Sequence, residues 1–194
     1  MATEATGLRE LKRIRTRQAI ADAAVELFAA HGYDNVTVAQ VAGKAEVSVA
    51  TLFNHVPDGK DALVFDDGTE RRDALVASVR DRDPGVTLLD AIHGYLSTRG
   101  PFARQMPPEM ELKRALILAT PQLREYQRTL WMRGEEALVR VVAAETGRQA
   151  LDPVVRALAR YVLEVPDLVG MDPDPRASLD AVFTLLAHGW SEGE

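Results

Sequence analysis

The chain has 194 residues, is 46% hydrophobic and carries a formal net charge of −6, a composition typical of one large or two small folded domains. It has no cysteine, which excludes disulfides, thiolate zinc sites, iron–sulfur clusters and thiol nucleophiles. Its apolar runs fall far short of the roughly 18–20 residues of a membrane span, and its basic N-terminus lacks the apolar core of a secretion signal, so we expect a soluble cytoplasmic protein.

Charge is distributed unevenly along the chain. Residues 1–60 hold seven basic and seven acidic side chains, so the whole excess of −6 lies in residues 61–194. Between Arg9 and Arg17 five cations accompany Glu10 alone, a local charge of 5 − 1 = +4. Such a cluster suits a polyanion such as nucleic acid, and a solvated basic tail would have the same composition.

The first part of the chain is predicted to be helical. Apolar residues recur every three or four positions over 9–30, which predicts one long helix that Gly32 ends. The Thr-x-x-Gln pattern at 37–40 is a capping box and predicts a short helix that ends near Ala45. A serine cap predicts a second short helix over 48–54, which Pro-Asp-Gly then breaks.

The rest of the chain is also predicted to be helical. One run extends from Lys60 to the break at Pro84-Gly85, with a bend at Asp67-Gly68. Further helices are predicted, between Gly and Pro breaks and a loop from Pro166 to Pro175, over 86–99, 108–119, 121–147, 151–165 and 174–190. We find no credible strand, so the predicted fold class is all-α.

The two short helices have the proportions of a helix-turn-helix, whose second helix offers its outward residues to the DNA major groove. Val49 and Ala50 can contact thymine methyl groups, and Thr51 and Asn54 can bond base edges or phosphates. Thr37, together with the amides of a helix start, can hold phosphate oxygens. The alternative interpretation is a small helical subdomain with a polar face.

A longer ordered pattern surrounds these helices over about residues 10–64. It comprises Thr16-Arg17-Gln18-Ala19-Ile20, Ala24, Leu27-Phe28, His31-Gly32-Tyr33, Val36-Thr37-Val38, Val41-Ala42, Val47-Ser48, the run from Thr51 to Pro57, and Lys60 with Leu63. This pattern resembles the DNA-binding domain of the TetR family of transcriptional regulators. The resemblance implies an all-helical, homodimeric regulator, usually a repressor, which a small molecule releases from its operator.

The resemblance and the outward positions together define the expected DNA-binding domain at 1–64 and a ligand-binding and dimerisation domain at 65–194. The expected DNA-binding residues are Arg13, Arg15, Arg17, Thr37, Lys44, Ser48, Val49, Ala50, Thr51, Phe53, Asn54, His55 and Lys60.

Two positions depart from the family pattern. Phe53 stands where the family usually has a tyrosine, so the phosphate contact of a tyrosine hydroxyl is lost there. The turn at 57–59 is one residue longer than usual, which puts the phosphate contact of Lys60 in question.

Two helices near the C-terminus are apolar nearly all round, over 151–165 and 177–190. A helix that is apolar on two sides needs two partners, and these can be its own core and an identical helix across a two-fold axis. A deeply buried helix in a monomer would show the same pattern. The predicted dimer interface comprises Val155, Leu158, Val162, Val182, Phe183, Leu186 and Trp190.

Aromatic and methionine side chains gather in the middle helices, where most of them serve as core. Gly and Pro interruptions between 100 and 121 predict irregular packing in which a mostly apolar cavity could open. The candidate ligand-binding residues are His93, Tyr95, Phe102, Met106, Met110, Tyr126 and Trp131.

Enzymatic motifs are lacking in the sequence. There is no Gly-x-Gly-x-x-Gly, no complete phosphate-binding loop, no His-Glu-x-x-His and no Gly-x-Ser-x-Gly. We therefore expect no catalytic site, metal or cofactor, and a ligand-responsive regulator that binds double-stranded DNA. The alternative is a ligand-binding or interaction protein on the same scaffold without sequence-specific DNA binding.

Overall fold

The structure is a computed structural model that describes residues 2–189. Over this range the regular structure consists of ten α-helices and two 3-10 helices, with no strand, which confirms the predicted all-α fold. The helices form two compact units. Unit 1 holds the described residues up to Asp67 together with Glu111–Tyr126, and unit 2 holds Gly68–Met110 and the described residues from Gln127 onward.

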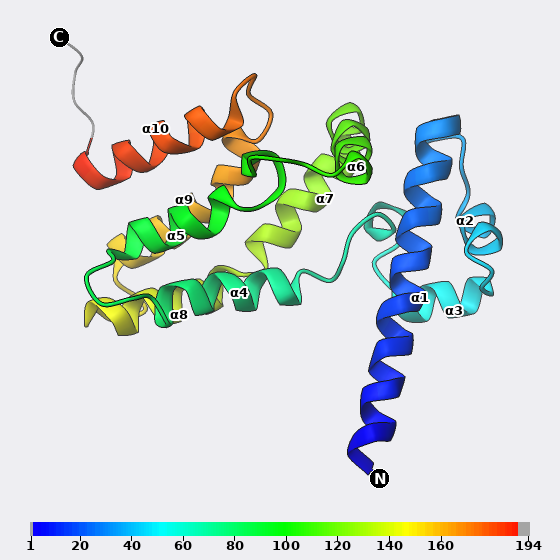
Figure 1. Cartoon of the computed structure of the whole chain (residues 1–194), viewed down its shortest axis with the longest axis horizontal. Helices are drawn as coiled ribbons and strands as arrows, with labels where there is room; N and C mark the ends of the chain where they lie inside the picture. The colour runs from blue at the N-terminus through cyan, green and yellow to red at the C-terminus, as the bar shows by residue number, and fades with distance from the viewer. Residues whose placement is uncertain (1, 190–194) are drawn as a thin grey trace. The chain divides into compact units, whose positions relative to one another are not determined.

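Unit 1 is built around one long helix with two short helices against it (Figure 1). Its elements are α1 (Ala2–His31), α2 (Val38–Lys44), α3 (Val49–His55), the 3-10 helix η1 (Lys60–Ala62), most of α6 (Pro108–Ala119) and the first half of α7 (Pro121–Met132). Ile20, Ala24 and Phe28 form one stripe of α1 and are at most 1% exposed. Because they are four residues apart, they bury a single face of the helix in the core of the unit.

The predicted helix ends of unit 1 are confirmed. Gly32 ends α1 with a φ of +82°, and its N–H donates to the Phe28 carbonyl at 2.9 Å. The Thr37 hydroxyl accepts from the Gln40 amide, and the Gln40 side chain accepts from the Thr37 amide, which completes the capping box of α2. The Ser48 hydroxyl accepts from the Thr51 amide at 3.0 Å and caps α3.

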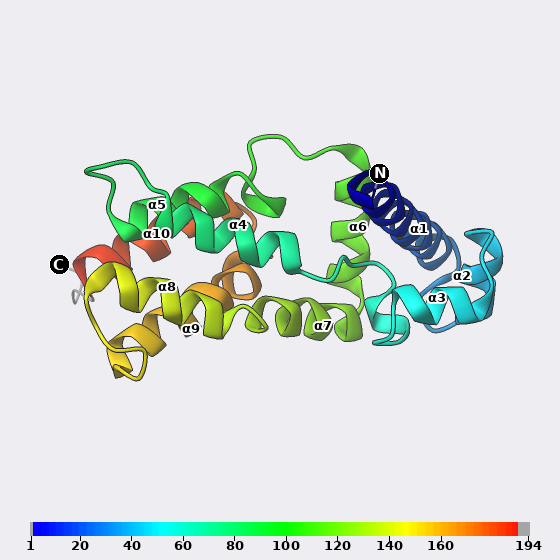
Figure 2. The same ribbon diagram turned by 90° about the horizontal axis from the view of Figure 1, so that it is seen from below.

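Unit 2 is a packed set of helices in which α4 contacts α5 and α8, α9 contacts α8, and α10 contacts α5 and α9 (Figure 2). Its elements are α4 (Thr69–Arg80), α5 (Leu88–Ser97), the 3-10 helix η2 (Gly100–Phe102), the end of α7, α8 (Glu135–Thr146), α9 (Pro153–Val169) and α10 (Pro175–His188). Ile92, Leu138 and Leu179 are fully buried in its core. No helix of residues 2–189 is both long and apolar enough to cross a membrane.

Three predicted boundaries in the later helices were wrong. The run predicted from Lys60 is not one helix: at the predicted bend Gly68 has a left-handed φ of +74°, and α4 begins only at Thr69. The segment 121–147 is two helices, because the chain turns at Gly134, where a Cβ would lie 3.2 Å from the Trp131 carbonyl oxygen. The helix α9 continues through Pro166 to Val169, where a loop was predicted.

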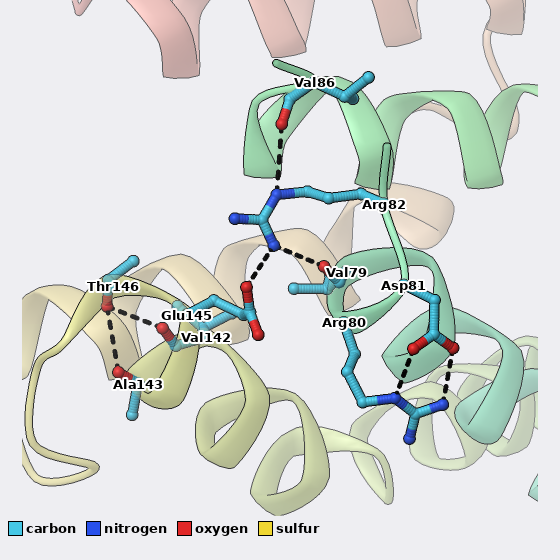
Figure 3. Close-up of polar contacts among 9 residues, drawn as sticks. All are labelled: Val79, Arg80, Asp81, Arg82, Val86, Val142, Ala143, Glu145 and Thr146. Carbon is cyan, nitrogen blue, oxygen red and sulfur yellow. Dashed lines mark hydrogen bonds and ion pairs between the residues drawn. The ribbon is translucent and has the colours of Figure 1, made fainter. Parts of the chain in front are cut away.

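Arg82 fixes the connection between α4 and α5 (Figure 3). Its guanidinium donates to the Val79 carbonyl at 2.6 Å and to the Val86 carbonyl at 3.2 Å. It also pairs with Glu145 of α8 at 2.6 Å. One side chain therefore closes the loop on itself and holds it against α8.

Candidate nucleic-acid interface

The helix α3 presents a mixed apolar and polar face to solvent. On the inner side of the helix Leu52 is fully buried, whereas on the outer side Val49 and Phe53 are 41% and 44% exposed. Ala50 and Asn54 are exposed as well, and Thr51 is partly exposed. Val49 and Phe53 lie one turn apart and form a small exposed apolar patch, and their neighbours on the helix are residue types able to contact bases.

The C-terminal end of α3 is held by Arg17 of α1. The Arg17 guanidinium donates to the His55 carbonyl, and it donates to the Phe65 carbonyl at 3.3 Å. The last carbonyls of a helix have no partner within the helix, so a cation at this point satisfies one of them and opposes the helix dipole. Arg17 was predicted to bind DNA, and the structure places its charged group on the backbone of unit 1.

Lys60 is also occupied within unit 1. Its ammonium group donates to the Tyr33 carbonyl at 2.5 Å and lies 4.1 Å from the centroid of the Tyr33 ring. The Tyr33 hydroxyl donates to Asp61, the residue after Lys60. Burial raises the pKa of the Tyr33 phenol well above its ordinary value, and the hydrogen bond to the Asp61 carboxylate raises that pKa further.

The other predicted DNA-binding residues are two helix-capping residues and four basic residues that are exposed or partly exposed. Thr37 and Ser48 cap the helices α2 and α3 with their hydroxyls. Lys44 pairs with Glu26 of α1 at 2.8 Å, with both side chains largely exposed. Arg13 and Arg15 are exposed on α1, and His55 is partly exposed at the end of α3. Exposed pairs such as Lys44 with Glu26 are weak, so the lysine can exchange its partner for a phosphate at little cost.

Tyr126, predicted to bind a ligand, belongs instead to unit 1. Its hydroxyl donates to an Asp58 carboxylate oxygen at 2.8 Å, and its ring lies 5.5 Å from the ring of Phe65. Asp58 stands in the turn that follows α3. The sequence shows that the turn is long, but no local signal links Asp58 to a residue 68 positions further along the chain.

The other six predicted ligand-binding residues lie in unit 2 but in different environments. The His93 imidazole contacts the Asp180 carboxylate at 2.6 Å, and the Tyr95 hydroxyl donates to the Arg71 carbonyl at 2.8 Å. Trp131 packs against the Arg71 guanidinium. Phe102 is 2% exposed, Met110 is 41% exposed and Met106 is partly exposed.

The predicted dimer residues mostly serve the core of the single chain. Val155 and Val162 are each 1% exposed and Phe183 is 6% exposed, so each is already covered by its own unit. Leu158, Val182 and Leu186 are partly buried against the same core. Trp190 lies outside the described residues.

The capped short helices, the three-residue turn from Ala45 to Val47 between Lys44 and Ser48, and the exposed face of α3 define a helix-turn-helix DNA-binding protein. Residues 20–66 match the sequence model of "Bacterial regulatory proteins, tetR family".

Similar proteins extend this match to most of the chain. The HTH-type transcriptional regulator TcmR of Streptomyces glaucescens is 33% identical over 84% of this chain and 74% of its own length. MftR of Mycobacterium tuberculosis, named for transcriptional regulation of mycofactocin biosynthesis, is 29% identical over 79% of this chain and 77% of its own. The solved structure of Salmonella enterica GusR has the same fold, with a TM-score of 0.51 and 22% identity over 89% of this chain and 91% of that one.

The chain belongs to the TetR family of bacterial regulatory proteins. It is a DNA-binding transcriptional regulator of a non-enzymatic family. In helix-turn-helix proteins the second of the two short helices, whose position α3 holds here, is called the recognition helix because it enters the major groove.

Proposed function

We propose that the protein is a homodimeric repressor that binds a pseudo-palindromic operator. A small, mostly apolar molecule releases the protein from this operator. The observation that carries the operator proposal is the exposed face of α3, where Val49, Phe53 and Asn54 stand outward on a helix capped at its start and clamped at its end. A rigid helix with such a face suits direct reading of base edges.

The operator proposal is tested by selecting duplexes from a random DNA pool with the wild-type protein. Two recognition helices related by a two-fold axis require like half-sites with centres about 34–36 Å apart, or a multiple of this distance. Enrichment of a pseudo-palindrome with that spacing supports the proposal. Failure to enrich any sequence would favour the alternative, a protein that keeps the helix-turn-helix scaffold without sequence-specific DNA binding.

Thr51→Ala tests which residues read the selected site. It should weaken binding by about 1–3 kcal/mol at particular base pairs and relax the sequence preference there. An unchanged preference would assign the reading to Val49, Ala50 or the shape of the DNA.

The dimer proposal rests on the outward faces of α9 and α10. Val154 and Leu168 of α9 are 58% and 55% exposed, and Ala177, Ala181 and Thr184 line the exposed side of α10. The small side chains on α10 allow an identical helix to approach closely. Ala181→Glu should therefore give a monomer in sedimentation experiments and abolish operator binding, whereas Ala150→Glu, exposed before α9, should do neither.

The effector site is proposed in unit 2, because six of the seven candidate ligand residues belong to it. Trp131 can report on binding, since the chain has only one other tryptophan, Trp190. In a Trp190→Phe variant, compounds that release the protein from its selected operator should change the fluorescence of Trp131. Release without any such change would place the effector away from this region.

A further inference from the structure

The turn between α3 and η1 is short and carries one anchored side chain. Pro57 has a fixed φ, and Gly59 adopts a φ of +90°, which other residues rarely adopt. Asp58 stands between them and accepts the hydrogen bond from Tyr126. The turn begins directly after Val56, whose amide still donates to the Leu52 carbonyl of α3 at 2.8 Å. Asp58 stands three residues after His55, the last residue of α3, so an anchor on Asp58 restrains the end of the recognition helix.

Tyr126 contacts a second segment that is tied to the same helix end. Its ring packs against Phe65, which is 2% exposed and whose carbonyl accepts from Arg17. The same guanidinium donates to the His55 carbonyl, the last residue of α3. The Phe65 ring also contacts α6, because the Lys113 ammonium group lies 5.3 Å from the centroid of that ring. Tyr126 thus meets the two chain segments, 57–59 and 65, that fix where α3 ends.

We propose that Tyr126 and Asp58 are positioning residues for the recognition helix: the hydrogen bond between them holds the turn after α3 and so fixes how α3 is presented to DNA. The turn at 57–59 has a length that places the Asp58 carboxylate within hydrogen-bonding reach of the Tyr126 hydroxyl of α7. The proposal goes beyond the DNA-binding activity by adding two residues that need not touch DNA.

This role predicts a selective defect. Side chains that read base edges need a fixed helix, whereas long cationic side chains can follow a phosphate over a small displacement. Loss of the anchor should therefore lower the affinity for the operator but not for unrelated duplexes. The slope of log affinity against log salt should stay unchanged, because the number of phosphate contacts is the same.

The test compares Tyr126→Phe, Asp58→Ala and Asp58→Asn with the wild type on the operator that the wild type selects. Tyr126→Phe removes the hydroxyl and keeps the ring against Phe65. Both changes at Asp58 remove the same charge, but asparagine keeps an oxygen that can accept from Tyr126. Ser97→Ala, which removes a hydroxyl bonded to the Gly94 carbonyl in unit 2, is the matched control.

We expect Tyr126→Phe and Asp58→Ala each to weaken operator binding about threefold to tenfold, the range of one hydrogen bond, without changing binding to unrelated DNA. The double variant should lose less affinity than the sum of the two single losses, because both changes remove the same hydrogen bond. Asp58→Asn should recover most of the affinity lost in Asp58→Ala, and Ser97→Ala should bind as the wild type does. Wild-type affinity in Tyr126→Phe, additive losses, or no recovery with asparagine would overturn the proposal.

A measurement without DNA keeps the proposal separate from the proposed function. Hydrogen exchange of the amides of Leu52 to Val56 should be faster in Tyr126→Phe than in the wild type, while exchange in α10 stays the same. If the wild type selects no operator, this measurement alone decides: unchanged exchange in α3 refutes the anchor, and faster exchange supports it even though the operator proposal has failed.

Discussion

Replacing Arg17 with methionine should destabilise the protein in the absence of DNA, although Arg17 belongs to the basic run that predicts phosphate contacts. The guanidinium donates to the carbonyls of His55 and Phe65, and both acceptors lie far along the chain from α1. Methionine keeps most of the apolar stem and removes the charged group. The two carbonyls then lose their donor, and the end of α3 loses the cation that opposes its dipole.

The size of the effect follows from these contacts. A hydrogen bond from a charged donor contributes about 1.5–3 kcal/mol when well formed, and the bond to Phe65 is long at 3.3 Å. The side chain is only partly buried, so water replaces part of what is lost. We therefore expect Arg17→Met to lower the free energy of unfolding by about 2 kcal/mol.

Urea unfolding and salt-dependent operator binding together test this reasoning, with Arg15→Met as the matched variant. Arg15 is exposed on the same helix, so its replacement should change stability by less than about 0.5 kcal/mol. If Arg15 meets a phosphate, the same change reduces the slope of log affinity against log salt by about 0.9 per protomer. Full stability of Arg17→Met, combined with a reduced salt slope, would show that Arg17 serves DNA and not α3.

Three further predictions concern the fold itself. Glu46, in the helix-turn-helix turn, has a φ of +55°, so Glu46→Gly should raise the free energy of unfolding by up to about 1 kcal/mol and Glu46→Val should lower it, as measured in urea. Gly170→Ala should lower the free energy of unfolding by about 1–3 kcal/mol and the melting temperature by several degrees, because the added Cβ would lie 2.3 Å from the Pro166 carbonyl oxygen. An unchanged melting temperature would contradict this contact. Hydrogen bonds from Arg128 lower the pKa of Glu164. The stabilisation from this pair is therefore fully present at pH values above the ordinary glutamate pKa, and it is lost as the pH falls through the lowered pKa. Glu164→Gln should therefore lose less stability than the wild type between neutral pH and pH about 3, by less than about 1 kcal/mol, and an equal loss in acid titrations would refute the linkage.

Local sequence signals were sufficient for the helix-turn-helix. Capping residues such as Thr37 and Ser48, and a glycine such as Gly32, act through bonds to amides and carbonyls only a few residues away. The stripe of apolar residues on α1 likewise needs no knowledge of distant contacts. The start of α3, its buried side and its exposed side could therefore be predicted from the sequence.

Roles that depend on distant contacts could not be predicted in this way. Arg17 and Arg15 look alike in a basic run, and only the fold brings the carbonyl of His55, 38 residues away, to the former. Tyr126 looks like an amphipathic pocket residue until the fold brings Asp58 to its hydroxyl. Pro166 is a strong local signal for a helix end, but α9 continues past it, with Val165 and Val169 buried on either side.

The composition of unit 1 from two separate stretches of chain has a consequence for biosynthesis. The ribosome completes α1, α2 and α3 well before it has made Glu111–Tyr126, so the buried Leu116 and Leu123 and the hydroxyl of Tyr126 are missing from the nascent unit until then. Closure of this unit must wait for a long-range contact, which is slower than local helix formation. A fragment that ends at Asp67 would lack this stretch permanently, and so a graft of the N-terminal helices onto another protein would transfer an incomplete unit.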